Sequence, residues 1–372
     1  MIQHIHIVCL DNPYPPNYGG AIDMFYKIKV LAELQIKIHL HYFDYHERKD
    51  ITELKKNCET VHVYERITGW KGLSLRQPYI ISSRINMRLI ENLNKDNYPI
   101  ILEGLHCGGL IPFVNKEKRK IIVRVHNNEE AYYTNLFKAE SNIFKKIYFA
   151  FEKYQLEKYQ RTLLPDILYA CISEKETNYF KSELNLKKSF HLPPFVAWPE
   201  VNCKEGLGEY CLYHGNLAVS ENEIAANYLI NIFSKLSATL IIAGNDPSNH
   251  IHQKLKKYGH IKLVKNPALH ELEALIKNAQ INILPSFTET GIKLKLLHAL
   301  FQGRHCIVNE MMIAGTGLSD LCTIINDESE MNEVVYKLFG KELTADEIET
   351  RRLVLKQHYD NKLHAEKLIQ YL

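Results

Sequence analysis

The sequence predicts an α/β protein with two Rossmann-like, doubly wound domains. Short apolar runs alternate with segments of helical periodicity along the whole 372-residue chain, which is typical of parallel sheets covered by helices. The alternation breaks once, at residues 192–199 (LPPFVAWP), and a proline-rich break of this kind indicates a linker between domains. We therefore expect one doubly wound sheet on each side of the break.

Apolar runs of strand length mark the elements in order. Before the break, strands are expected at residues 5–10, 36–42, 61–64, 99–102, 120–125 and 167–172. After it, strands are expected at residues 210–214, 239–243, 261–264, 281–284, 305–308 and 323–325. One long helix is expected from Glu129 to Arg161, because apolar residues recur there at helical spacing. The predicted organisation is a first domain (1–195), a linker (196–207), a second domain (208–342) and C-terminal helices (343–372).

Composition restricts the class of protein. The chain is 46% hydrophobic and 24% charged, which is ordinary for a soluble protein with one or two full cores. Its net charge of +3 gives no general preference for nucleic acid, and no segment has the length of a membrane-spanning helix. The short apolar run at the start predicts a buried strand rather than a signal peptide. Eight scattered cysteines without CxxC pairs predict reduced thiols in a cytoplasmic protein.

The most informative segment is residues 290–306 (TGIKLKLLHALFQGRHC). Gly291 ends a strand-to-helix turn, Lys293 and Lys295 open an apolar helix, and Gly303 leads into the next strand. A helix N-terminus presents unpaired N–H groups and a partial positive charge, to which the two lysines add formal charge. This arrangement predicts a phosphate-binding site. The alternative is an ordinary helix on a parallel sheet with solvated lysines.

Further candidate residues follow the predicted strands, where doubly wound sheets bind ligands. Gly19 and Gly20 precede a helix and would let the backbone approach a bound group, although they could form a simple loop. His126 could donate to a sugar hydroxyl or a phosphate oxygen, or it could belong to a turn capped by asparagine. The chain lacks HExxH, GxSxG, Walker-type and GxGxxG motifs, and no metal site is expected.

Several segments together resemble the glycosyltransferases of the GT-B fold, and most closely the retaining family 4. They are PYPPNYGG, RVHNNEEAYY, ILYACISEKE, the HGN and IIAGND turns, and GIKLKLLHALFQGRHCIVN, in the family's order over nearly the whole chain. The resemblance implies two Rossmann-like domains facing a cleft. It also implies a nucleotide-sugar donor bound mainly by the second domain, an acceptor bound mainly by the first, and a final helix that crosses back to the first domain.

The resemblance also assigns roles to single residues. It places Gly19 and Gly20 near the donor diphosphate and the acceptor, and it implies catalytic roles for His126, Lys293 and Lys295. The remaining donor-binding residues that it implies are Gly215, Asn216, Glu289, Thr290, Gly291, Ile292 and His298. Thr290 and His298 stand where many relatives carry the two glutamates of an E-x7-E motif. Because residues 215–222 lack the family's usual Arg and Lys, Lys293, Lys295 and Arg304 are expected to supply the charge.

The expected activity is transfer of a hexosyl group from a nucleotide sugar to a glycan or lipid-linked acceptor, with retention, in glycan or polysaccharide assembly. No metal, cofactor or nucleic acid is expected to take part. The alternatives are a sugar-nucleotide epimerase and a non-catalytic nucleotide-binding scaffold of the same fold. The protein is expected in the cytoplasm. For residues 129–161 the favoured interpretation is a helix with a buried apolar face, and the alternative is contact with the inner face of the membrane through aromatic and lysine side chains.

Overall fold

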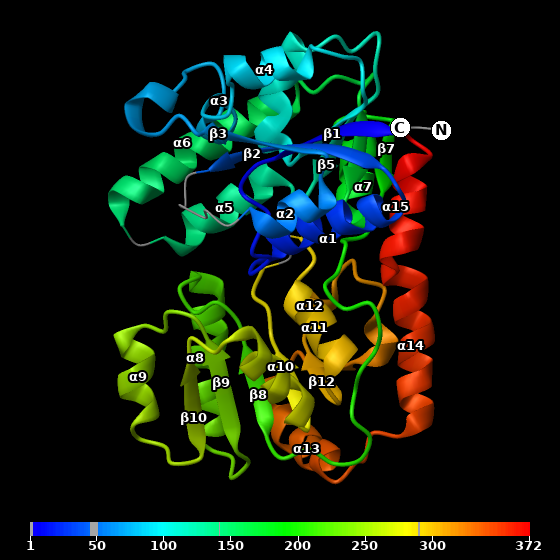
Figure 1. The fold of residues 1–372 in the computed structure, drawn as a ribbon. Coiled ribbons are helices and arrows are strands. Elements are labelled where there is room, and N and C mark those ends of the chain that lie inside the picture. Colours follow the sequence, from blue (N-terminus) through cyan, green and yellow to red (C-terminus); the bar gives the residue numbers. More distant parts are fainter. Residues whose placement is uncertain (1–2, 45–50, 141, 289–290) are drawn as a thin grey trace. The chain divides into compact units, whose positions relative to one another are not determined.

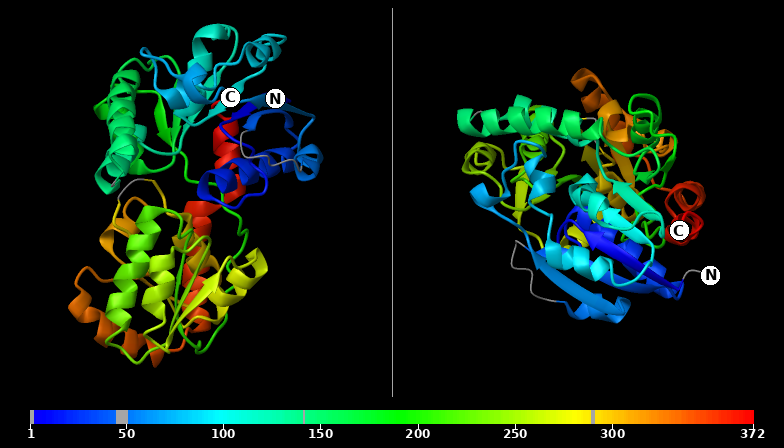
Figure 2. Two further views of the ribbon diagram at one scale, coloured as in Figure 1. Left: turned by 90° about the vertical axis from the view of Figure 1, so that its left-hand side faces the viewer. Right: turned by 90° about the horizontal axis from the view of Figure 1, so that it is seen from above.

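The computed structural model describes residues 3–44, 51–140, 142–288 and 291–372 (Figure 1). The chain divides into two compact units, one formed by Met1–Ala197 with Tyr359–Leu372 and the other by Trp198–His358. Each unit has its own parallel sheet, and Figure 2 gives two further views of them. The predicted fold class, two parallel-sheet α/β domains, is therefore confirmed. In the described ranges, no helix has the length and apolarity needed to cross a membrane.

The described part of the first unit holds a seven-stranded parallel sheet in the order β3-β2-β1-β4-β5-β6-β7. Its strands are β1 (His4–Cys9), β2 (Lys37–Asp44), β3 (Thr60–Glu65), β4 (Ile100–Glu103), β5 (Ile121–Val125), β6 (Leu168–Cys171) and β7 (Ser189–His191). The direction of winding reverses between β1 and β4, so the carboxyl ends of these strands flank a topological switch point. β7 was not predicted, because its three residues are too few to show a pattern.

The helices of the first unit lie on both faces of this sheet. They are α1 (Gly19–Glu33), α2 (Thr52–Asn57), η1 (Gly69–Gly72), α3 (Tyr79–Ser82), α4 (Met87–Leu93), η2 (Leu105–Phe113), α5 (Glu129–Ala139), α6 (Ile143–Gln160), α7 (Glu174–Ser182) and α15 (Asn361–Ile369). The prediction of a single helix from Glu129 to Arg161 is wrong. A new helix begins at Ile143 because the Asn142 side chain accepts hydrogen bonds from the backbone N–H groups of Phe144 and Lys145, at 3.0 and 3.2 Å.

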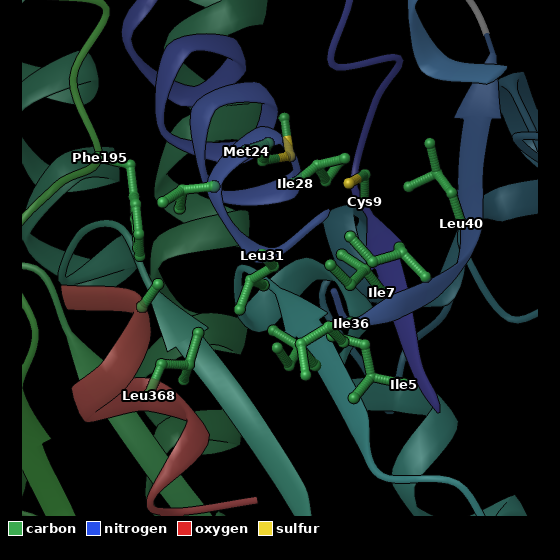
Figure 3. Close-up of a cluster of buried hydrophobic side chains, with 14 of the residues drawn as sticks. Ile5, Ile7, Cys9, Met24, Ile28, Leu31, Ile36, Leu40, Phe195 and Leu368 are labelled. Atoms are coloured by element: carbon green, nitrogen blue, oxygen red, sulfur yellow. The ribbon is translucent and has the colours of Figure 1, made fainter. Parts of the chain in front are cut away.

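Two apolar clusters cover the two faces of the first sheet. In Figure 3, Met24 and Ile28 of α1 lie with Ile5 and Ile7 of β1, and Leu368 of α15 belongs to the same cluster. The cluster on the opposite face includes Val8 of β1, side chains of α4 and η2, and Phe180 of α7. Because both faces are covered, β4, β5 and β6 are apolar at most positions, whereas β1, β2 and β3 alternate apolar residues with histidine and other polar residues.

The second unit holds, among its described residues, a six-stranded parallel sheet in the order β10-β9-β8-β11-β12-β13. Its strands are β8 (Cys211–His214), β9 (Leu240–Gly244), β10 (Ile261–Lys265), β11 (Ile281–Leu284), β12 (His305–Val308) and β13 (Thr323–Ile324). Its helices are α8 (Ser220–Phe233), α9 (Asn249–Leu255), α10 (Leu269–Asn278), α11 (Leu294–Gln302), α12 (Glu310–Ile313), η3 (Ser319–Leu321) and α13 (Glu328–Phe339). α14 (Ala345–Tyr359) begins in this unit and ends at the first residue of the C-terminal segment that belongs to the first unit. The switch point of this sheet lies between β8 and β11.

Candidate functional site

The predicted donor-binding residues of the second unit that the structure describes lie near the switch point between β8 and β11. β8 leads through Gly215 and Asn216 to α8, and β11 leads to α11. The Gly215 N–H donates to the carbonyl oxygen of Ala243 at 3.1 Å, so the turn after β8 is tied to the end of β9. A side chain on the neighbouring Gly244 would overlap the Gly215 carbonyl oxygen. This close approach of two turns requires a glycine.

Lys293 and Lys295 point to the first turn of α8. Lys293 is the N-cap residue of α11, and its Nζ donates to Thr288 Oγ1 at 3.1 Å and lies 3.7 Å from Glu221 Oε1. Lys295 Nζ donates to Asn222 Oδ1 at 2.8 Å and to the Tyr213 hydroxyl at 3.4 Å. The alternative of solvated lysines is therefore wrong, since both ammonium groups are held against the protein.

The charges at this point are unequal. Two lysines face one carboxylate, Glu221, among the described residues, and the partial positive charge of the α8 N-terminus adds to theirs. Burial is the largest cause that lowers the pKa of Lys295, to about 8, and Lys293 lowers it further while Glu221 acts in the opposite sense. An anion bound here would be favourable because it would balance the excess charge.

Two buried histidines lie beside the lysines. The His298 ring stacks on Trp198 at a centroid distance of 4.3 Å, and the His214 ring meets His298 edge-on at 5.8 Å. In the described part of the chain, the Nε2 atoms of both histidines are buried without a hydrogen-bond partner. Burial lowers the pKa of His298 to about 3 and that of His214 well below its usual value. Both imidazoles are neutral at pH 7, so they can hydrogen-bond a hydroxyl group but cannot balance a phosphate charge.

The structure also places the other predicted residues of the second unit. Gly291 has a φ of 66°, in the left-handed region that favours glycine, and Ile292 is half-buried just before α11. Asn216 is exposed, and its side chain accepts from the Ala218 N–H at 3.1 Å. Glu289 and Thr290 lie outside the described residues.

The expectation that Arg304 supplies charge to this site is wrong. Arg304 precedes β12 and so lies at the amino edge of the sheet, opposite the switch point. Its guanidinium donates to the carbonyl oxygens of Gly206 at 3.1 Å and Lys277 at 2.5 Å. A cation at the C-terminal end of α10 is favoured by the helix dipole, which explains this position.

In the first unit, the paired glycines begin helix α1. Gly19 and Gly20 are its first two residues, and Tyr18 is its N-cap residue. A Cβ atom on Gly20 would lie 3.0 Å from the Tyr18 ring, and the Tyr18 hydroxyl donates to Asp11 at 3.2 Å. The first turn of α1 carries no acidic side chain, which leaves its N–H groups suitable for an anionic or hydroxyl ligand.

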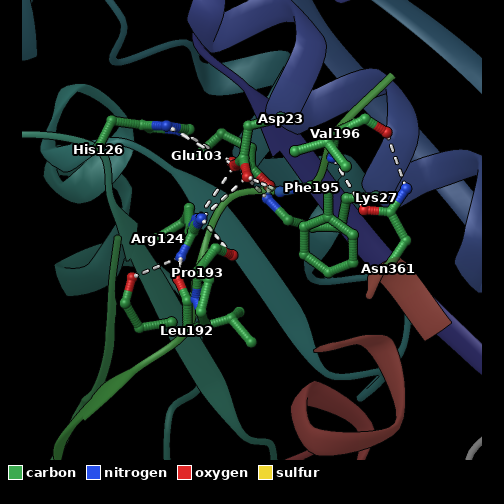
Figure 4. Close-up of polar contacts among 11 residues, drawn as sticks. Asp23, Lys27, Glu103, Arg124, His126, Leu192, Pro193, Phe195, Val196 and Asn361 are labelled. Carbon is green, nitrogen blue, oxygen red and sulfur yellow. Dashed lines mark hydrogen bonds and ion pairs between the residues drawn. The ribbon is translucent and has the colours of Figure 1, made fainter. Parts of the chain in front are cut away.

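His126 belongs to a buried cluster of charged residues (Figure 4). Its Nε2 lies 3.0 Å from Glu103 Oε2, at the end of β4, and its Nδ1 lies 3.7 Å from Asp23 Oδ2 on α1. The first distance is that of a hydrogen bond and the second is longer. The ring is therefore fixed through Nε2, while Nδ1 keeps the capacity for another partner.

Two cations neutralise the carboxylates of this cluster. The Arg124 guanidinium donates to both carboxylate oxygens of Asp23, at 3.0 and 2.9 Å, and Lys27 Nζ donates to Glu103 at 2.7 Å and to Asp23 at 3.1 Å. Burial alone would raise the pKa values of Asp23 and Glu103, but the cations and His126 outweigh it and hold both pKa values below their usual range. Both carboxylates are therefore ionised and paired.

The cluster also contains the one group among the described residues that could hold a metal ion, formed by Asp23, Glu103 and His126. Both carboxylates are already balanced by Lys27 and Arg124, so a divalent cation would add uncompensated charge to a buried site. Sequence reasoning identified only His126. Asp23, Glu103 and Arg124 could have been noticed because each is a charged residue inside an otherwise apolar helix or strand.

Comparisons with known proteins agree with this architecture. Residues 208–339 match the family model described as glycosyl transferases group 1. An uncharacterised 44.6 kDa protein from the cps region of Klebsiella pneumoniae is 25% identical over 351 residues, which cover 87% of this chain and 88% of that protein.

Three solved structures have the same fold over nearly their whole length. A sucrose-phosphate synthase from Thermosynechococcus elongatus has a TM-score of 0.72 at 13% identity, covering 99% of this chain and 98% of its own. A variant of S. aureus TarM, in complex with Fondaparinux, α-GlcNAc-glycerol and UDP, has a TM-score of 0.69 at 12% identity. The match covers 100% of this chain and 99% of the TarM chain. The lipopolysaccharide outer core galactosyltransferase WaaB has a TM-score of 0.63 at 13% identity. The match covers 99% of this chain and 98% of the WaaB chain. The chain thus has the fold of GT-B glycosyltransferases, and residues 208–339 match the model of the glycosyl transferases group 1.

Proposed function

We propose that this protein is a retaining glycosyltransferase of family 4, which moves a hexosyl group from a nucleotide sugar to a glycan or lipid-linked acceptor. The observation that carries the proposal is that Lys293 and Lys295 both lie against the first turn of α8, at the switch point of the domain that matches the group 1 glycosyl transferases. The TarM structure in complex with UDP supports a nucleotide as the ligand, and the cps region of the Klebsiella relative supports a role in polysaccharide assembly.

The proposed donor site lies in the second unit. The diphosphate contacts Lys293, Lys295 and the first turn of α8, and the turn at Gly215 and Asn216 lets the backbone come close to it. The Nε2 atoms of His214 and His298 hydrogen-bond hydroxyl groups of the nucleotide ribose, in place of the family's second glutamate. Gly291 and Ile292, just before α11, complete the described part of the proposed donor site.

Stabilisation of the leaving diphosphate is then the main catalytic task. Each well-placed cation in a desolvated site contributes about 3 kcal/mol to the transition state, by analogy with donors in oxyanion holes. The leaving phosphate can itself accept the proton of the attacking hydroxyl group, on the same face of the sugar. We propose that the reaction needs no metal ion, because the lysines supply the charge that the phosphates require.

In the first unit, we propose that His126 hydrogen-bonds the transferred sugar through Nδ1. The bond from Nε2 to Glu103 would hold the ring in place, and Arg124 and Lys27 would hold the carboxylates. His126 is thus the proposed catalytic residue, and Glu103 and Asp23 are positioning residues. Gly19 and Gly20 contribute backbone N–H groups of α1 to the same site.

The proposal is tested by incubating the purified protein with a panel of UDP-, GDP-, ADP- and dTDP-sugars, with and without candidate glycan acceptors. A thermal-shift screen with the same panel first identifies the donor through ligand-linked stabilisation. Nucleotide release that depends on the acceptor supports a transferase. Sugar conversion without release would instead identify an epimerase, and binding without either reaction a scaffold.

A further inference from the structure

Helix α6 packs Leu156, Tyr148, Phe149 and Tyr159 in an apolar cluster of the first unit, and it exposes further apolar side chains on another face. Its buried residues are Glu152, Gln155, Leu156 and Gln160. Its exposed apolar residues are Ile143 (61% exposed), Phe144 (80%), Ile147 (61%), Phe151 (39%) and Tyr154 (53%), which we call the exposed stripe. A helix on the surface of a globular domain normally has a polar outer face. The prediction of a buried apolar face is confirmed for Leu156 and its neighbours, and the exposed stripe is a second apolar face that the prediction did not include.

The polar face of α6 is fixed to the first unit by hydrogen bonds. Glu152 Oε1 accepts from the backbone N–H of Tyr79 at 2.8 Å, and Gln155 Nε2 donates to the Ser74 carbonyl oxygen at 3.3 Å. Rotation of α6 that buried the stripe would break these bonds and leave buried polar groups unsatisfied. The stripe consequently faces outward as a stable feature of the fold.

The stripe is continuous along α6, and a neighbouring loop exposes further apolar side chains. Residues 144, 147, 151 and 154 are three or four positions apart, so they share one face of the helix. Beside α6, the loop that contains η1 exposes Trp70 (90%) and Leu75 (88%). Trp70 and Tyr148 of α6 line a common shallow hollow of about 230 Å³. α6 and its partner α5 lie side by side at the edge of the first unit (Figure 1).

Helix α6 carries more lysines than exposed carboxylates, and Lys158 lies beside the exposed stripe, whereas Lys153 Nζ lies 3.8 Å from Glu130 Oε1 on α5. Lys145, Lys146, Lys153 and Lys158 all lie on α6, whereas Glu157 is the exposed carboxylate of this helix and pairs with Arg161 at 3.1 Å. Lys158 Nζ lies 4.3 Å from the centre of the Tyr154 ring, and Lys146 Nζ lies 5.1 Å from the centre of the Phe137 ring. In both pairs the ammonium group lies over the face of the ring, which is a cation–π contact. A helix that combines lysines with exposed aromatic and aliphatic side chains is suited to a membrane interface.

We propose that the exposed stripe, together with Trp70, docks the protein on a membrane that carries anionic headgroups. The apolar side chains would enter the headgroup boundary, and the lysines would contact the anionic lipids. A second copy of the chain fits less well, because a twofold contact through the stripe would bring two sets of four lysines together. The inference is independent of the proposed transfer activity, since none of these residues belongs to the donor or His126 sites.

The test is co-sedimentation of the full chain with phosphatidylcholine vesicles that contain or lack phosphatidylglycerol, at low and moderate salt. We expect salt-sensitive binding to the anionic vesicles only. A triple variant, Phe144→Ser with Ile147→Ser and Phe151→Ser, should lose binding at least tenfold. The triple variant Lys145→Gln, Lys146→Gln and Lys153→Gln should weaken binding by roughly fivefold per lysine at low salt. Both should keep the melting temperature of the wild type, because the altered side chains are mostly exposed.

The matched control replaces three exposed apolar residues of the second unit, Ile224→Ser, Leu269→Ser and Leu353→Ser. This control should bind vesicles as the wild type does. Absence of wild-type binding to either vesicle type would overturn the proposal. The proposal would also be overturned if sedimentation velocity showed a dimer of the wild type that the Phe144→Ser, Ile147→Ser and Phe151→Ser variant does not form. That result would mean that a second copy of the chain covers the stripe. Transfer to a soluble acceptor, measured without vesicles, should be equal in the wild type and the stripe variant, so failure here is distinguishable from failure of the proposed activity.

Discussion

The two polar clusters of this protein lie at equivalent places, the switch point of each sheet, but they differ in charge balance. In the first unit, Asp23 and Glu103 are matched by Lys27 and Arg124, and every charge is buried and paired. In the second unit, Lys293 and Lys295 face the single described carboxylate of Glu221. A cluster of paired charges holds a side chain in place, whereas two ammonium groups beside a helix N-terminus favour a bound anion. This difference is why we propose positioning for the first cluster and anion binding for the second.

The largest expected effect comes from breaking the balance of the first cluster. Arg124→Met should destabilise the first unit by about 3–5 kcal/mol, because it leaves the Asp23 carboxylate buried without its main partner. Hydrogen exchange measured by mass spectrometry, with peptides from β5 and α1, reports this loss for the first unit separately. Arg161→Met, which removes an exposed ion pair, is the control and should change little. Unchanged protection in the Arg124 variant would mean that the cluster does not stabilise the unit.

His126→Ala tests whether the first cluster exists to position this histidine. Turnover should fall by about 100-fold, the range for removal of one acid–base or hydrogen-bonding catalyst, while donor affinity changes little. The measurements are steady-state kinetics, donor titration and the melting temperature. If stability and activity fell together, a role for His126 in capping the turn before α5 would explain the result better.

The pH dependence of donor binding tests the second cluster. Burial holds the pKa of Lys295 at about 8, and a bound diphosphate would raise it. Binding would then take up protons above pH 8, so donor affinity should fall as the pH rises through 8, by at most about tenfold per pH unit. Below pH 7 this lysine should cause no change. Lys295→Arg, which stays charged, should abolish the decline. A wild-type affinity that is constant from pH 7 to 9 would contradict the proposed contact.

The sequence predicts the fold well because both faces of each sheet are covered, so that central strands such as β4 and β9 are short apolar runs. It misses short features that depend on single contacts. The three residues of β7 show no pattern, and the break between α5 and α6 depends on the Asn142 cap. These features follow from local hydrogen bonds rather than from periodicity.

The sites were predicted unevenly for a related reason. Lys293 and Lys295 stand beside glycine at a helix start, which is a local signal. Asp23, Glu103 and Arg124 show only a charged residue inside an apolar segment. Their partners could not be predicted, because Arg124 binds a carboxylate 101 residues away in the chain. Arg304 was assigned wrongly because its distance from Lys295 in the sequence does not reveal that it lies at the opposite edge of the sheet.

The central claim is that the second cluster binds a diphosphate, and calorimetric titration with UDP, GDP, ADP and dTDP tests it most directly. The account predicts that the wild type binds at least one of them. The double variant Lys293→Ala and Lys295→Ala should bind it at least 100-fold more weakly, since each charged hydrogen bond contributes about 1.5–3 kcal/mol. The double variant should remain folded. Folding lowers the pKa of Lys295, so the positive charge of this lysine does not stabilise the folded protein in the absence of ligand. Lys337→Ala, which removes an exposed lysine of α13, should bind as the wild type does. Equal affinity in the wild type and the double variant, or no binding of any diphosphate by the wild type, would contradict the claim.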